Sequence, residues 1–139
     1  MKRFFMLGTC LVALTGLALT GCAKQQKKTT TGMKRIHFDF DKSDIKASAE
    51  PALRNNAKWL QENSSKNITI AGHCDERGSF EYNIALGDRR ANSAKNYLKN
   101  LGIASNRLRT VSYGEEQAVA TCSNESCWWQ NRRAEFIAK

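Results

Sequence analysis

The sequence predicts an α/β fold in which helices pack on a β-sheet. Short runs of alternating apolar and polar residues, typical of strands, are separated by two longer stretches whose apolar residues recur at helical spacing. An order of strand, helix, strand, helix, strand is typical of crossover units, in which the helices cover the sheet. The 139 residues are enough for one domain of about 100 residues with terminal attachments.

The strands are predicted from alternation and from the turn residues that bound them. The first covers residues 36–40, where Ile36, Phe38 and Phe40 alternate with polar residues. Three further strands are predicted at residues 67–72, 108–113 and 132–138. Residues 115–130, between the last two strands, are expected to form one long connection.

Two helices are predicted between these strands. The first begins at about Ser48, a plausible N-cap, and has Pro51 in its first turn. One face of this helix carries Ala49, Leu53, Ala57 and Leu60. The second helix extends to about Leu101 and is closed by Gly102 as the C′ residue.

Two polar residues lie on the apolar side of the second helix. The apolar stripe consists of Ala94, Tyr97, Leu98 and Leu101. Asn83 and Arg90 fall on the same stripe when it is continued toward the start of the helix. An inward-facing polar group must find a hydrogen-bond partner or open onto a pocket.

A long motif surrounds these two residues. It consists of Gly72-His73, Asp75-Glu76-Arg77-Gly78, Glu81-Tyr82-Asn83, Leu86-Gly87 and Arg89-Arg90-Ala91. The motif resembles the OmpA-like peptidoglycan-binding domain and, within it, the peptidoglycan-associated lipoproteins. The resemblance covers about residues 34–139 and implies a two-layer sandwich: a mixed four-stranded sheet with helices packed on one face.

The motif places an acid and a base where they can bind a zwitterion. Asp75 follows a strand, and Arg90 lies about two turns into the next helix. A carboxylate can bind the ammonium of an amino-acid end, while a guanidinium binds its carboxylate as a bidentate fork. Diaminopimelate in peptidoglycan stem peptides presents such an end, and the resemblance assigns it to Asp75 and Arg90. The resemblance adds wall-contacting positions at Phe40, Asp41 and Leu86, and Asn83 is expected to order the loop.

Other interpretations of these charges remain open. Composition alone favours a structural ion pair between Asp75 and Arg90, and both roles are compatible if a ligand separates the pair. Arg132 and Arg133 point to opposite faces of the last predicted strand, so at most one of them serves the site. The other is expected to be a solvated edge charge.

Catalysis, metal binding and a cofactor are not expected. His37 and His73 lack the spacing of a metal motif, and no oriented base is evident for Cys74, which is expected to be a small buried side chain. The formal charge of +9 fits polyanionic partners in general. Without a basic stripe with interleaved aromatic residues, nucleic acid is not expected as a partner.

The start of the chain is similar to a bacterial lipoprotein signal. Residues 1–21 combine an early Lys2-Arg3 pair with an apolar run that ends in Leu19-Thr20-Gly21-Cys22, which resembles a lipobox. This implies cleavage before Cys22 and its acylation. The alternative is an uncleaved anchor, but the run is shorter than the roughly 20 residues of a spanning helix.

The predicted mature chain has a lipidated cysteine, a linker and one domain. Residues 22–33 form the anchor and a polar linker, and residues 34–139 form the domain. By resemblance to other lipoproteins, Ala23 implies sorting to the outer membrane, with the domain in the periplasm. The resemblance also implies Tol-system periplasmic and inner-membrane proteins as partners.

Three cysteines remain after cleavage and acylation, namely Cys74, Cys122 and Cys127. In an oxidising envelope, we expect a disulfide between Cys122 and Cys127, which bracket four polar residues. A bond from Cys74 to either one, or three free thiols, are the alternatives.

Two functions follow from the sequence. The first is an outer-membrane lipoprotein that tethers the membrane to peptidoglycan through diaminopimelate, as part of the Tol-Pal envelope and cell-division system. The alternative is a protein-interaction hub that docks a periplasmic Tol partner and binds the wall weakly.

Overall fold

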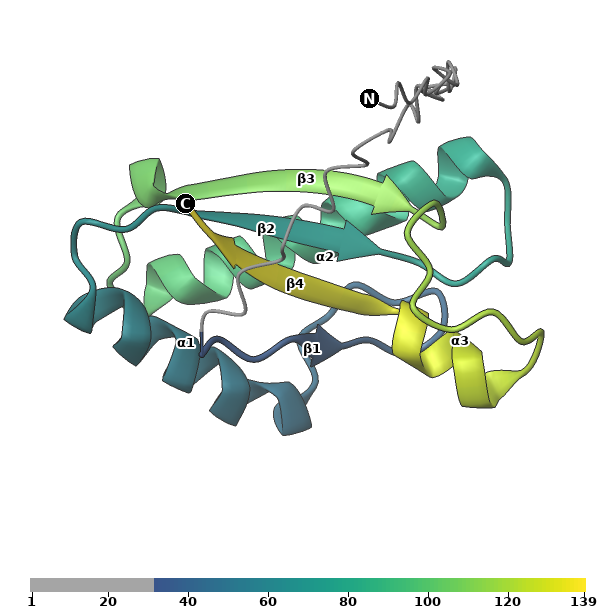
Figure 1. Ribbon diagram of the computed structural model, residues 1–139, viewed down its shortest axis with the longest axis horizontal. Coiled ribbons are helices and arrows are strands. Elements are labelled where there is room, and N and C mark those ends of the chain that lie inside the picture. Colours follow the sequence, from purple (N-terminus) through teal and green to yellow (C-terminus); the bar gives the residue numbers. More distant parts are fainter. Residues whose placement is uncertain (1–31) are drawn as a thin grey trace, which may run out of the picture.

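Four strands form one mixed sheet in the order β1–β4–β2–β3. The computed structural model describes residues 32–139 (Figure 1). Its elements are β1 (Ile36–His37), α1 (Glu50–Glu62), β2 (Ile68–His73), α2 (Phe80–Asn100), β3 (Leu108–Gly114), α3 (Glu125–Asn131) and β4 (Arg133–Ala138). The predicted signal peptide, Cys22 and nearly all of the linker lie outside the described residues.

The strand β2 is central to the sheet because it pairs on both sides. It runs parallel to β3, with Ile70 opposite Thr110, and antiparallel to β4, with Ile70 opposite Phe136. The short strand β1 adds an antiparallel edge to β4, with Ile36 opposite Ala134. The parallel pair needs the crossover helix α2, as the order of elements predicts.

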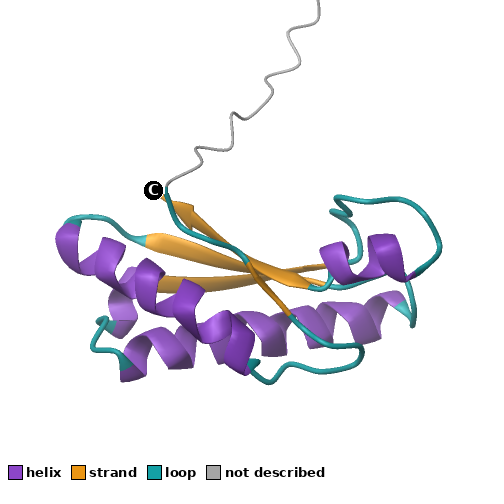
Figure 2. Ribbon diagram, turned by 90° about the horizontal axis from the view of Figure 1, so that it is seen from below, coloured by secondary structure: helices purple, strands orange, loops and turns teal. Residues whose placement is uncertain are grey.

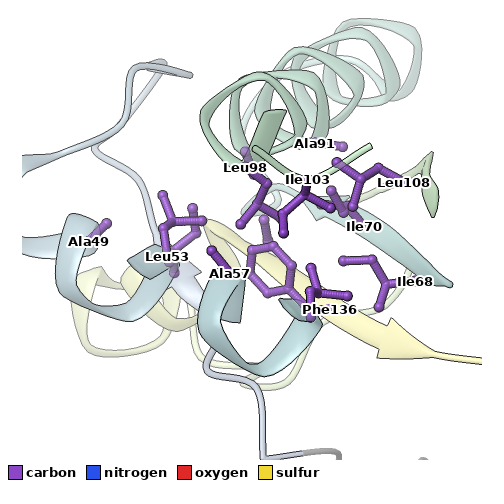
Figure 3. Close-up of a cluster of buried hydrophobic side chains, with 14 of the residues drawn as sticks. Ala49, Leu53, Ala57, Ile68, Ile70, Ala91, Leu98, Ile103, Leu108 and Phe136 are labelled. Carbon is purple, nitrogen blue, oxygen red and sulfur yellow. The ribbon is translucent and has the colours of Figure 1, made fainter. Parts of the chain in front are cut away.

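The helices α1 and α2 cover one face of the sheet (Figure 2). The apolar side chains of this interface form a single core (Figure 3). Leu53 and Leu60 of α1 are fully buried in it, and so is Leu98 of α2. The sandwich with helices on one face is thereby confirmed, and so is the apolar face predicted for the first helix.

Two glycines allow the start of α2 to lie directly against β2. A Cβ atom at Gly72 would lie 1.8 Å from the carbonyl oxygen of Gly87, and a Cβ at Gly87 would lie 2.3 Å from Ser112 Oγ. At Gly72 the obstacle is backbone, so only glycine fits there, whereas a Cβ at Gly87 would require the Ser112 side chain to move. The contact fixes the distance between the loop after β2 and the first turns of α2.

The start of the domain differs from the prediction in two places. The first strand ends at His37 rather than residue 40, because the chain turns at residues 39–42 and Asp41 adopts a φ of 54°. Phe38 is nevertheless buried and its amide donates to Arg132 O at 2.9 Å. Ser48 is not an N-cap: it lies within a 3₁₀ turn, Ala47–Ala49, that leads into α1.

The long connection predicted at residues 115–130 contains a helix that the sequence did not indicate. The helix α3 begins after Asn124, whose side chain accepts a hydrogen bond from the Ser126 amide at 3.0 Å. Cys122 and Cys127 are joined by a disulfide, with their Cα atoms 5.5 Å apart. The polar composition of residues 123–126 hides the helix, because N-cap residue types are equally typical of loops.

None of the helices within residues 32–139 is long and apolar enough to cross a membrane.

Candidate functional site

A pocket of about 190 Å³ opens where the turn at residues 39–42, the loop after β2 and the start of α2 meet. It is lined by all six residues predicted to bind the wall: Phe40, Asp41, Asp75, Asn83, Leu86 and Arg90. Four further residues complete the lining: Cys74, Arg77, Gly78 and Tyr82. The structure thus brings the predicted positions together in one place.

Asp75 is the buried acid of this pocket, and two arginines hold its carboxylate. Arg77 donates through Nε to Oδ1 at 3.0 Å, through Nη2 to Oδ2 at 2.7 Å and through its amide to Oδ1 at 3.1 Å. Arg132 Nη1 donates to Oδ2 at 3.2 Å. Burial alone would raise the pKa of Asp75, but the hydrogen bonds from Arg77 and Arg132 outweigh it, and the pKa lies below its usual value.

Arg77 lies between two aromatic rings at the edge of the pocket. Its guanidinium carbon is 3.9 Å from the ring centroid of Phe40 and also 3.9 Å from that of Trp128. Both distances are within the range of a cation–π contact. The Arg77 side chain is still 30% exposed, so this cation is accessible from solvent.

Arg90 is fully buried and its donors are mostly committed to the protein. Nε donates to Lys42 O at 2.8 Å, Nη2 to Asp39 O at 3.1 Å and Nη1 to His73 O at 2.8 Å. Nη1 also donates to Cys74 Sγ at 3.4 Å. With four of its five N–H groups engaged, Arg90 ties the turn at residues 39–42 to the end of β2. The suggested ion pair between Asp75 and Arg90 is therefore wrong, because Asp75 is paired with Arg77 and Arg132 instead.

Asn83 and Gly78 shape the loop that carries Asp75. Asn83 Nδ2 donates to the backbone carbonyl of Asp75 at 3.3 Å and also to Glu115 Oε2. Gly78 has a φ of 112°, a conformation that other residues adopt only with strain. Ser79 then caps α2 by accepting a hydrogen bond from the Tyr82 amide at 3.2 Å.

The mouth of the pocket is aromatic. Phe40 is 55% exposed, and the Tyr82 hydroxyl donates a hydrogen bond to the carboxylate of Asp41. This bond connects the turn at residues 39–42 to the first turn of α2, across the opening. It also raises the pKa of Tyr82.

Cys74 is a free, buried thiol in the wall of the pocket. It donates to Asn83 O at 3.2 Å, and burial raises its pKa to about 11. A thiol with this pKa is almost entirely protonated near neutral pH, which makes it a poor nucleophile. Within residues 32–139, no three His, Cys, Asp or Glu side chains are grouped to hold a metal ion.

The two arginines at the end of the chain have separate roles. Arg132 serves the site and also pairs with Glu125 of α3. Arg133 is not the solvated edge charge that the sequence suggested. It is fully buried and donates to Glu135 Oε1 at 2.9 Å, to Asn131 O at 3.3 Å and to Gln117 O at 3.0 Å. The loop after β3 covers it, which strand alternation cannot reveal.

Sequence reasoning missed the participation of Arg77, Tyr82 and Trp128 in this site. Arg77 and Tyr82 lie inside the motif, so the motif itself could have pointed to them. Nothing in the sequence indicates that Trp128 lies against Arg77, because the two residues meet only through the tertiary fold.

Comparisons with known proteins agree with this fold and motif. Residues 37–132 match the model of the OmpA family. A peptidoglycan-associated lipoprotein of Brucella melitensis is 52% identical over 100 residues, which cover 72% of this chain and 60% of the relative. That of Rhizobium meliloti is 50% identical over 110 residues, covering 79% and 62%.

The three-dimensional fold is also similar to that of a solved structure. The crystal structure of the peptidoglycan-associated lipoprotein from Burkholderia pseudomallei superposes with a TM-score of 0.75 at 35% identity. The alignment covers 78% of this chain and 92% of that structure. This chain spans only about 60% of the length of the Brucella protein. From the matched residues and the shared fold, we conclude that the chain belongs to the OmpA family, with relatives that are peptidoglycan-associated lipoproteins.

Proposed function

We propose that the domain binds peptidoglycan non-covalently and that the pocket at Asp75 receives the zwitterionic end of diaminopimelate. The observation that carries this proposal is the carboxylate of Asp75, which is only 3% exposed. The other charged residues that line the pocket are Arg77, Arg90 and Asp41. A site of this kind offers both signs of charge to a small ligand end that carries both. The names of the relatives, which are peptidoglycan-associated lipoproteins, support peptidoglycan as the ligand.

The ligand ammonium has to replace an existing partner of Asp75. The four lone-pair positions of the carboxylate already accept four hydrogen bonds, three from Arg77 and one from Arg132. Arg77 is the partner to be displaced, because its side chain is 30% exposed while that of Arg132 is 6% exposed. The displaced guanidinium and the remaining N–H of Arg90 would then bind the ligand carboxylate.

Sedimentation with purified sacculi tests this proposal. Sacculi whose stem peptides contain diaminopimelate are expected to retain the full-length chain. Sacculi with lysine at the same position are the control, because lysine has the side-chain ammonium but lacks the second carboxylate. Equal retention on both types, or retention on neither, would contradict a diaminopimelate site.

We also propose that Cys22 is acylated and anchors the chain in the outer membrane, with the domain in the periplasm. The motivation is the lipobox-like end of the apolar run, residues 19–22. Several acyl chains would anchor firmly, at about 0.8 kcal/mol per buried CH₂. Mass spectrometry of the mature protein is expected to show an acylated N-terminal cysteine. An intact Met1 start or an unmodified Cys22 amine would rule the anchor out.

A second candidate function is docking of a periplasmic Tol-system protein, with the wall and this partner competing for one face. Two exposed aromatic residues that line the pocket favour it: Phe40 and Tyr82, which are 55% and 44% exposed. Exposed aromatic residues are enriched at protein interfaces. Release of such a partner by a soluble muropeptide would support a shared face, and simultaneous binding would exclude it.

A further inference from the structure

The helix α3 touches the pocket from outside, through one aromatic ring. Trp128 does not line the pocket, but its ring forms one of the two walls around Arg77. Its Nε1 also donates to Glu76 Oε1 at 3.2 Å, which orients the ring on the loop that carries Asp75. Phe40 and Trp128 therefore hold the Arg77 guanidinium at the edge of the pocket, where it can bind the ligand carboxylate once the ligand ammonium has taken its place on Asp75.

A second residue of α3 shares an arginine with Asp75. The Glu125 carboxylate accepts from Arg132 Nη1 at 3.1 Å and from Nη2, while the same Nη1 donates to Asp75 Oδ2 at 3.2 Å. The Arg132 guanidinium is therefore shared between two carboxylates, those of Glu125 and Asp75. Without Glu125, the nearly buried Arg132 would interact more strongly with Asp75 and compete harder against a ligand ammonium.

The disulfide holds α3 in this position. A helix of seven residues is too short to be stable without tertiary support. The Cys122–Cys127 bond ties its first turn to the preceding loop, where the Cys122 amide also donates to Cys127 Sγ at 3.1 Å. At the other end, Asn131 accepts from the Val119 amide at 2.8 Å. Loss of the disulfide would free the first turn of α3 from the preceding loop and leave the helix held by the bonds of Asn131 and by the contacts of Glu125 and Trp128 with the site.

We propose that α3 is a positioning element for the pocket and that its disulfide makes wall affinity depend on the thiol–disulfide state of the envelope. The inference rests on the function proposed above and adds Trp128, Glu125 and the disulfide to it. A dithiol supplies the two electrons and two protons of the reduction. The S–S bond breaks, Cys122 and Cys127 each gain a thiol, and the dithiol becomes a disulfide.

The reduction experiment uses the full-length chain in detergent and a soluble muropeptide that contains diaminopimelate. Affinity is measured before and after treatment with dithiothreitol. We expect reduction to weaken binding roughly 3- to 10-fold, the range for losing a partly exposed cation–π or ion-pair contact. A Cys122→Ser/Cys127→Ser variant is expected to bind like the reduced chain and not to respond to dithiothreitol. Thermal unfolding monitors whether each sample remains folded.

Substitutions in α3 separate positioning from general stability. Trp128→Leu is expected to weaken muropeptide binding by a similar factor, and Trp128→Phe to restore most of it, because a second ring can still cover Arg77. The matched control is Trp129→Leu, because the Trp129 ring lies against His37, with ring centroids 4.9 Å apart, whereas the rings against Arg77 are those of Phe40 and Trp128. Glu125→Gln is expected to weaken binding with Trp128 intact, and Glu116→Gln, on an exposed residue, is its control.

The outcomes distinguish this inference from the function on which it rests. An unmodified, oxidised chain that does not bind the muropeptide overturns the proposed function. A chain that binds equally well when reduced, or that binds equally well with Trp128→Leu and Glu125→Gln, retains that function and overturns the role of α3.

Discussion

Asp75→Asn is expected to lower the affinity for diaminopimelate-containing peptidoglycan by roughly 30- to 150-fold, which corresponds to about 2–3 kcal/mol. The substitution keeps the shape of the side chain but removes the charge that would bind the ligand ammonium. Sedimentation with sacculi, or titration with a soluble muropeptide, measures the loss. Asp88→Asn, at an exposed position of α2, is the matched control and should bind like the unmodified chain.

The effect of Asp75→Asn on the free energy of unfolding is expected to depend on pH. The folded-state pKa of Asp75 lies below its ordinary value of 3.8. The carboxylate therefore stabilises the fold above that value, and this contribution is lost as the pH falls through the folded-state pKa. We expect the difference in unfolding free energy between the unmodified chain and Asp75→Asn to shrink below about pH 4. A difference that is constant from pH 7 to pH 2, or unchanged affinity in a folded variant, would contradict the role of Asp75.

Arg90→Met is expected to destabilise the domain by about 3–5 kcal/mol. Methionine fills similar volume but leaves the carbonyls of Asp39, Lys42 and His73 without their donor. Urea unfolding measures the change. Arg89→Met, at the exposed neighbouring position, is the control and should change stability little.

Arg90→Lys distinguishes structural from ligand-binding roles of this position. An ammonium can reach one or two of the three carbonyls, so we expect an intermediate loss of stability. If Arg90→Lys remains folded, its affinity for the muropeptide should still fall, because the turn at residues 39–42 is held less firmly. If Arg90→Met were as stable as the unmodified chain, Arg90 would not be the tie between this turn and β2.

The sequence predicted those parts of the fold that follow from the spacing of residues within one helix or strand. The inward position of Asn83 and Arg90 followed from helical spacing alone, and both residues are buried. Gly102, with a φ of 92°, ends α2 as predicted. These features depend on residues a few positions apart, and local spacing encodes them directly.

The sequence was insufficient where partners come from distant segments. Arg132 reaches Asp75 across 57 positions, and either Arg132 or Arg133 could have been the one to do so. The sequence suggested Arg90 as the ion-pair partner of Asp75, but the partner within the motif is Arg77, two positions from the acid. Only the tertiary fold shows that Arg90 donates its hydrogen bonds to backbone carbonyls and that Arg77 donates to Asp75.

The sheet order has a consequence for the time course of folding. The unit β2–α2–β3 is contiguous in the chain, and its pairing of Ile70 with Thr110 closes a much shorter loop than the pairing of β1 with β4. The pairing of Ile36 with Ala134 joins the two ends of the domain and carries a larger loop-closure entropy. The turn at residues 39–42 and Arg132 depend on that late pairing. A nascent domain would therefore acquire most of its secondary structure before it acquires a pocket, and ligand retention would report the last step of its folding.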